Sequence, residues 1–203
     1  MMISPGFPDK PCGGEKKKPL QLENALEAVG KGARLAAKLK TDIDGLQERG
    51  RPPVAPHRPE FDEEAWKSLA TYLIEERRLI GFLLGPAVRA NQDGTLRYIY
   101  PTDICLDCFA TLDGKHWRFP DDGTRKTLHA RAGRINVRLA HFSWTLTKPD
   151  PRLDAGDWST TYIDQIVNGL GQFSGWLEMT ERRPLADTLR RSMSLDRPLD
   201  VDS

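Results

Sequence analysis

The sequence predicts a mainly α-helical bundle with a small β-hairpin insertion. In several long segments apolar residues recur at spacings of three and four, as they do on the buried face of an amphipathic helix. Stretches rich in proline and glycine separate these segments. Only residues 88–100 show alternating large side chains around an Asp-Gly turn, a pattern typical of a hairpin.

Composition limits the class of protein. The 203 residues suffice for one domain with a core, and the 38% hydrophobic and 29% charged content fits a globular protein with a charged surface. No run approaches the roughly 18 apolar residues of a membrane span, and the N-terminus lacks the apolar region of a secretory signal. Three cysteines do not make a disulfide framework. We therefore predict a cytoplasmic protein with no membrane partner.

The N-terminal part divides into a tail, a helix and a linker. Residues 1–18 are rich in Pro, Gly and Lys, which predicts a disordered tail. A helix is predicted from residue 19 to about residue 47, although Gly30 and Gly32 weaken it. Residues 51–59 hold four prolines and are predicted to be a linker, because proline cannot continue a helix.

The second helix has clear start and stop signals. Asp62 is suited to be its N-cap, and the acids Glu63 and Glu64 favour the positive helix end. Gly85-Pro86 should end it, ahead of the predicted hairpin. A short helix is then expected over residues 102–112.

The next predicted helix, from about Asp121 to Phe142 or Trp144, carries two stripes of side chains. The apolar stripe consists of Leu128, Ala132, Ile135, Leu139 and Phe142. The basic row consists of Arg131, Arg134, Arg138 and His141. At about 100° per residue the basic row occupies one sector beside the apolar stripe. No acidic residue occurs between Gly123 and Pro149, so we expect this row to border a groove that holds an anionic group.

The C-terminal part predicts one long helix and one short one. Ser159 or Thr160 should cap a helix whose apolar residues follow the 3, 4, 3, 4 spacing, namely Ile163, Ile166, Leu170, Phe173 and Leu177. Its glycines 169, 171 and 175 suggest close helix approach, including at a dimer seam. We predict one bundle domain over residues 19–180, followed by a short helix and polar tail over residues 181–203.

Two other clusters contain residue types found in metal or redox sites. Cys105 and Cys108 form a CxxC, but a zinc site needs four ligands and only His116 and His129 lie nearby in the sequence. A pair of small core residues, or one core and one exposed residue, fits the CxxC better. The run Glu75-Glu76-Arg77-Arg78 is expected to be a solvated, self-paired face. We predict no metal and no cofactor.

The basic row has the groups needed for RNA backbone cleavage. Guanidinium groups of Arg134 and Arg138 can neutralise a phosphate, and the imidazole of His141 can transfer a proton near neutral pH. The ribose 2′-hydroxyl is then the nucleophile, so the protein need not supply one. Two alternatives remain: a solvated face whose arginine stems cover apolar neighbours, and a non-catalytic groove that binds nucleic acid or an acidic protein partner.

The segments RINVRLAHFSW and TTYIDQIVNGLGQFSGWLE resemble the C-terminal half of HEPN-type bacterial proteins, over roughly residues 124–178. In that superfamily a bundle helix carries an Arg, four to six residues, and a His, and Arg134 and His141 match this spacing. Ile135 follows the arginine, where many members have a polar residue.

The resemblance implies a metal-independent endoribonuclease, a hydrolase of the toxin-antitoxin or phage-defence type. It also implies a homodimer that brings two motifs together, with an antitoxin or other protein as a further partner. By position, Arg134 would contact the scissile phosphate and His141 would be the general acid or base. Asn136 and Arg138 would support them. Arg131 is expected to contact RNA as part of the basic row, and Trp144 to stack on a base or pack in the core.

Overall fold

The computed structural model describes residues 19–50, 62–84, 88–90, 96–98, 106–109, 113–115, 117–119, 121–140 and 160–194. This part of the chain is mainly α-helical. Its helices are α1 (Pro19–Glu48), α2 (Glu63–Leu84), η2 (a 3-10 helix, Leu106–Phe109), α3 (Asp122–Ala140), α5 (Tyr162–Met179) and α6 (Arg183–Met193). The predicted tail at residues 1–18 and linker at residues 51–59 lie outside the described residues.

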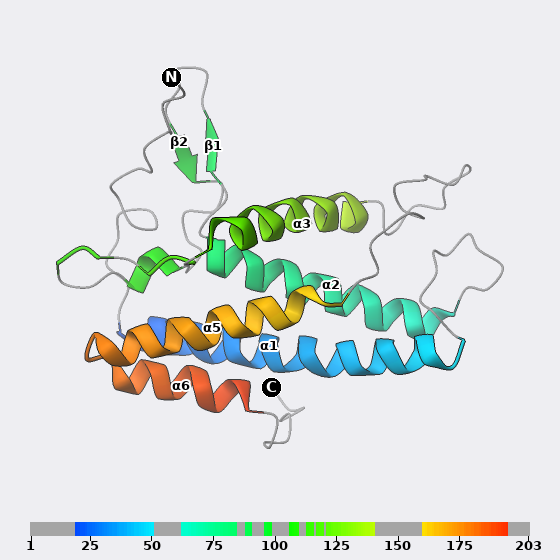
Figure 1. Ribbon diagram of the computed structural model, residues 1–203, viewed down its shortest axis with the longest axis horizontal. Helices are drawn as coiled ribbons and strands as arrows, with labels where there is room; N and C mark the ends of the chain where they lie inside the picture. The colour runs from blue at the N-terminus through cyan, green and yellow to red at the C-terminus, as the bar shows by residue number, and fades with distance from the viewer. Residues whose placement is uncertain are drawn as a thin grey trace.

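Helix α2 is central to the arrangement. It contacts α1, α3 and α5, whereas α6 packs on α1 and α5 (Figure 1). Helix α3 therefore lies on the far side of α2 from α1 (Figure 1). Two short strands, β1 (Val88–Ala90) and β2 (Leu96–Tyr98), pair antiparallel with Arg89 opposite Arg97. They fall within the span of the predicted hairpin, whose turn lies outside the described residues, as does most of the helix expected over residues 102–112.

Helix α1 runs without interruption through Gly30 and Gly32 because both lie against neighbouring helices. A Cβ added at Gly30 would lie 2.0 Å from Oγ of Ser192 on α6. One added at Gly32 would lie 2.8 Å from Oε2 of Glu75 on α2. The glycines thus permit close helix approach, and this packing offsets their low helix propensity.

Aspartate side chains cap the N-termini of two helices at the positions that the sequence predicts. The Asp62 carboxylate accepts a hydrogen bond from the backbone N–H of Ala65 at 3.0 Å, so Asp62 is the N-cap of α2. The Asp121 carboxylate accepts bonds from the backbone N–H groups of Gly123 and Thr124, at 2.9 and 2.8 Å, and from the Thr124 hydroxyl. These bonds, chiefly the one from the hydroxyl, lower the pKa of Asp121.

The prediction that Ser159 or Thr160 caps α5 is wrong. The N-cap of α5 is Thr161, and it makes no side-chain capping bond. The Thr160 hydroxyl instead donates to Oδ1 of Asp44 on α1 at 2.9 Å. Its carbonyl accepts a bond from the hydroxyl of Tyr72 on α2 at 3.0 Å. Thr160 therefore fixes the start of α5 to two other helices.

The core is built from the apolar faces of the helices. All five apolar residues predicted for α5 are buried, which confirms that stripe. The rings of Phe82, Phe109 and Phe173 meet edge to face, with centroids 5.6–6.0 Å apart. Gly169 lies against Phe119, where a Cβ would come within 2.3 Å of Cζ. A Cβ added at Gly171 would meet no described atom within 4 Å. Contacts among the described residues therefore do not account for this glycine, and the suggested dimer seam stays a prediction.

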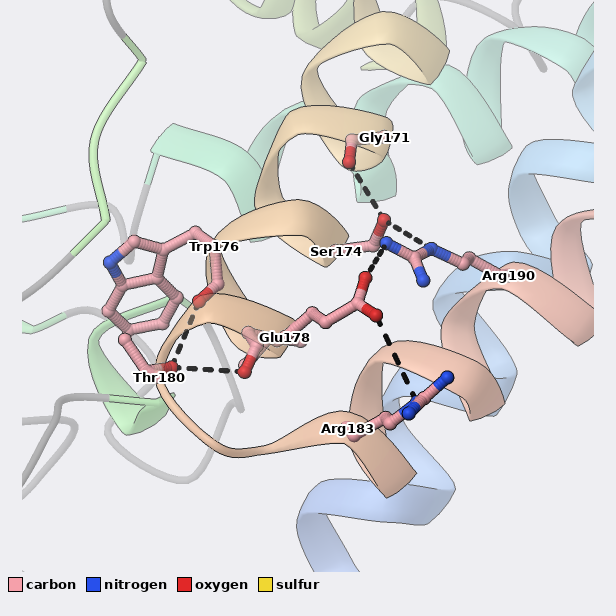
Figure 2. Close-up of polar contacts among 8 residues, drawn as sticks. Gly171, Ser174, Trp176, Glu178, Thr180, Arg183 and Arg190 are labelled. Carbon is pink, nitrogen blue, oxygen red and sulfur yellow. Dashed lines mark hydrogen bonds and ion pairs between the residues drawn. The ribbon is translucent and has the colours of Figure 1, made fainter.

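A cluster of polar contacts joins α5 to α6 (Figure 2). Glu178 accepts a hydrogen bond from Nη2 of Arg190 at 2.7 Å and lies 3.9 Å from Nε of Arg183. Nε of Arg190 also donates to Oγ of Ser174 at 3.1 Å. The bond from Arg190 is the main reason that the pKa of Glu178 lies below its ordinary value of 4.5. These contacts hold α6 against α5 on either side of the short turn that joins the two helices.

We expect Gly30→Ala to destabilise the protein by about 1–2 kcal/mol, because the clash with Ser192 outweighs the roughly 1 kcal/mol that alanine gains over glycine in a helix. Urea denaturation measures this. Gly45→Ala is the matched control in the same helix, where an added Cβ meets only Nη1 of Arg49 at 3.4 Å. The control should be as stable as the native chain or more so. An equal increase in the free energy of unfolding for both variants would contradict the close packing of Gly30 against Ser192.

We expect Glu178→Gln to lower the melting temperature at pH 7 and to have progressively less effect in acid. A carboxylate whose pKa is lowered by folding stabilises the protein above its ordinary pKa of 4.5. That stabilisation is lost as the pH falls through the lowered folded-state value. Melting curves of both chains from pH 7 down to about pH 3 test this. Glu48→Gln, at the end of α1 away from the α5–α6 turn, is the control (Figure 1). If the difference in melting temperature between Glu178→Gln and the native chain did not change with pH, the Glu178 carboxylate would not be stabilised by folding as described.

Candidate functional site on helix α3

Helix α3 is held on α2 by its apolar stripe. The side chains of Leu128 and Ile135 are fully buried, and Ala132 packs against the same core. Ile135 is thus a core residue, as the helical spacing predicts. Because its sequence neighbour Arg134 points about 100° away around the helix axis, the burial of Ile135 directs Arg134 away from the core.

Arg131 is not part of an exposed row. Its side chain is 1% exposed, and it forms a bidentate ion pair with Glu76 of α2, which is 0% exposed. Nε donates to Oε1 and Nη2 to Oε2, both at 2.9 Å. The expectation that Arg131 contacts RNA is therefore corrected, and so is the expectation that Glu76 lies on a solvated face. Glu75, its neighbour, does pair with Arg78 at 2.8 Å.

Both members of this ion pair lie on the apolar faces of their helices. Arg131 is within about 60° of both Leu128 and Ile135 around the axis of α3. Glu76 follows the buried Tyr72 and Leu73 of α2 at spacings of four and three. A charged residue at a core-facing position in each of two helices was the signal that could have predicted the pair, because buried charges are paired.

Arg134 lies exposed at the edge of α3 that faces the start of α5. Its Nη2 donates a hydrogen bond to the hydroxyl of Tyr162 at 3.2 Å. Tyr162 is the first residue of α5 and is half-buried. On the other side, the guanidinium carbon of Arg131 lies 4.8 Å from the centroid of the Tyr162 ring, a cation–π contact. Tyr162 is a member of this site that sequence reasoning missed.

The start of α5, and with it Tyr162, is fixed by hydrogen bonds of Thr160. Burial is the main cause that raises the pKa of the Tyr72 hydroxyl far above its ordinary value of 10.0, so this hydroxyl stays protonated and donates to Thr160. Thr160 is also tied to Asp44 of α1, as described above. Ile163, directly after Tyr162, is buried in the core. The position of the tyrosine ring is therefore set by α1, α2 and the core together.

Several predicted site residues fall partly or wholly outside the described part of the chain. The backbones of Asn136 and Arg138 belong to α3, but their side chains are outside it. His141 and Trp144 lie outside it altogether, and so does Cys105. The structure thus brings Arg131 and Arg134 to the same tyrosine but does not test the pairing of Arg134 with His141.

Cys108 and His129 do not form a metal site with other described residues. Cys108 is half-buried and packs against the core, whereas His129 is exposed on α3. Among the described residues, no three His, Cys, Asp or Glu side chains come together as a metal ion would require.

No protein-family model, curated protein or solved structure matches this chain. Among the described helices, none combines the length and the apolar character needed to cross a membrane.

We expect Glu76→Ala to lower the free energy of unfolding by about 3–5 kcal/mol, because it leaves the Arg131 charge buried without its carboxylate. The double variant Glu76→Leu with Arg131→Met should be more stable than Glu76→Ala, since it removes both charges. Denaturant unfolding measures all three chains. Glu27→Ala is the surface control: Glu27 pairs with Lys31 at 2.9 Å in solvent, and its loss should cost about 1 kcal/mol or less. If Glu76→Ala and Glu27→Ala lowered the free energy of unfolding by similar amounts, the ion pair of Glu76 would not be buried.

Proposed function

We propose that this protein is a metal-independent endoribonuclease of the HEPN type, in which Arg134 binds the scissile phosphate and His141 moves a proton. The observation that carries the proposal is the exposure of Arg134 beside a core in which the neighbouring Arg131 is already neutralised by Glu76. The helix therefore offers a fixed guanidinium at its surface. The Arg-to-His spacing of the superfamily supports the same residues.

The proposed reaction needs only groups of the RNA and of this chain. The ribose 2′-oxygen attacks the adjacent phosphorus and loses its proton to a base, while the 5′-oxygen leaves and gains a proton. The products are a 2′,3′-cyclic phosphate and a 5′-hydroxyl end. Arg134 would stabilise the charge that develops on the phosphate oxygens. His141 would serve as the acid or base, because imidazole changes its protonation near neutral pH.

The remaining predicted residues have supporting roles in this proposal. Arg138, one helical turn after Arg134, would add a second phosphate contact, and Asn136 and Trp144 would contact the RNA around it. We include a homodimer, with the two motifs facing each other, and a toxin-antitoxin or phage-defence setting, because the superfamily resemblance implies both. Arg131 is not included among the RNA-contacting residues of this proposal, because its charge is paired with Glu76 in the core.

We expect Arg134→Ala and His141→Ala each to reduce the rate of RNA cleavage by about a hundredfold or more, because each removes a group that acts in the transition state. Purified protein is incubated with total RNA, and the products are followed on denaturing gels. Circular dichroism should show unchanged helicity. Lys126→Ala is the matched control, because Lys126 is an exposed cation of the same helix, about 80° from Arg134 around the axis.

Two results would contradict this proposal, one its site and the other its activity. One is full activity in both variants, which would show that the site lies elsewhere. The other is salt-dependent RNA binding by the native chain without cleavage products, which would favour a non-catalytic module that binds nucleic acid. Salt-dependent binding to an acidic protein, with none to RNA, would favour a protein partner.

A further inference from the structure

Tyr162 is placed between two arginines of α3 that differ in their environment. Its ring lies under the buried guanidinium of Arg131, at 4.8 Å, and its hydroxyl accepts a hydrogen bond from the exposed Arg134, at 3.2 Å. One face of the side chain therefore contacts the core ion pair, and its polar tip reaches the surface. Tyrosine suits this position because its body is apolar and its end is polar.

The tyrosine is itself held in place. It follows Thr160, which is bonded to Tyr72 and Asp44, and it precedes the buried Ile163. The hydroxyl of such a fixed ring can hold the end of a long side chain in one position through a hydrogen bond. Arginine loses much rotamer freedom when it binds a phosphate, and a hydrogen bond made before binding reduces that loss.

We propose that Tyr162 is a positioning residue that orients the Arg134 guanidinium for the RNA phosphate, an inference that rests on the proposed function. Tyr162 does not touch the reacting atoms. It acts through Arg134, by accepting a hydrogen bond from Nη2–H of the guanidinium. The guanidinium of Arg131, which is paired with Glu76, contacts the face of the Tyr162 ring.

The test is Tyr162→Phe, which removes the hydroxyl and keeps the ring that contacts Arg131. We expect RNA cleavage, measured as kcat/KM, to fall by about three- to tenfold, the usual effect of losing one hydrogen bond. The melting temperature should stay close to that of the native chain. Thr180→Val is the matched control for loss of a hydroxyl: it lies after the other end of α5, and its hydroxyl donates to the Trp176 and Leu177 carbonyls (Figure 2). It should leave cleavage unchanged.

A double-mutant cycle separates positioning from a general structural role. In the Arg134→Ala background, Tyr162→Phe should have almost no further effect, because the group that it orients is gone. A second readout needs no RNA. In ¹⁵N relaxation measurements, the Nε–H of Arg134 should become more mobile in Tyr162→Phe than in the native chain.

The outcomes distinguish this inference from the proposed function. If Arg134→Ala reduces cleavage and Tyr162→Phe does not, only the role of Tyr162 is overturned. Equal losses from Tyr162→Phe in both backgrounds would also overturn it, because they indicate a structural effect independent of Arg134. If the native chain neither cleaves nor binds RNA, the proposed function fails and the role of Tyr162 in it fails too.

Discussion

The buried ion pair between Arg131 and Glu76 is the interaction on which the candidate site depends. Each charge would be very costly in the core alone, so the two must meet with good geometry. The two parallel hydrogen bonds of 2.9 Å provide that geometry. Because one partner is on α2 and the other on α3, the pair fixes both the rotation of α3 and its position along α2. The position of Arg134 follows from that placement, whereas Tyr162 is held by the contacts of Thr160 with α1 and α2.

Rotation of α3 separates two arginines that appear equivalent in the sequence. A step of three residues turns the helix by about 300°, which moves Arg134 about 60° from Arg131 and away from the buried Leu128 and Ile135. Arg131 therefore has a structural role, and Arg134 is left at the surface beside Tyr162. Arg131 and Arg134 thus lie in two different environments on one helix, one buried and one exposed.

The features that depend on neighbours in the sequence could be predicted, and those that depend on distant partners could not. The Asp62 cap and the buried stripe of α5 follow from local spacing and are confirmed. Glu76 is 55 residues from Arg131, and Thr160 is 116 residues from Asp44. The spacing within one helix does not identify either partner, and a core-facing charge in each of two helices was a signal for the ion pair alone. The roles of Asn136, Arg138, His141 and Trp144 stay predictions, because their side chains lie outside the described part of the chain.

The ion pair also specifies the site in a way that apolar packing cannot. Leu128, Ala132 and Ile135 would fill a groove on α2 almost as well after a shift of α3 by one turn, because the stripe repeats at that spacing. A shift that brings Leu128 or Ile135 opposite Glu76 would leave two buried charges without partners. The charges therefore disfavour those registers, and in the observed register the Arg134 side chain reaches the Tyr162 hydroxyl. A pair that adds little net stability can in this way determine where the exposed arginine is held.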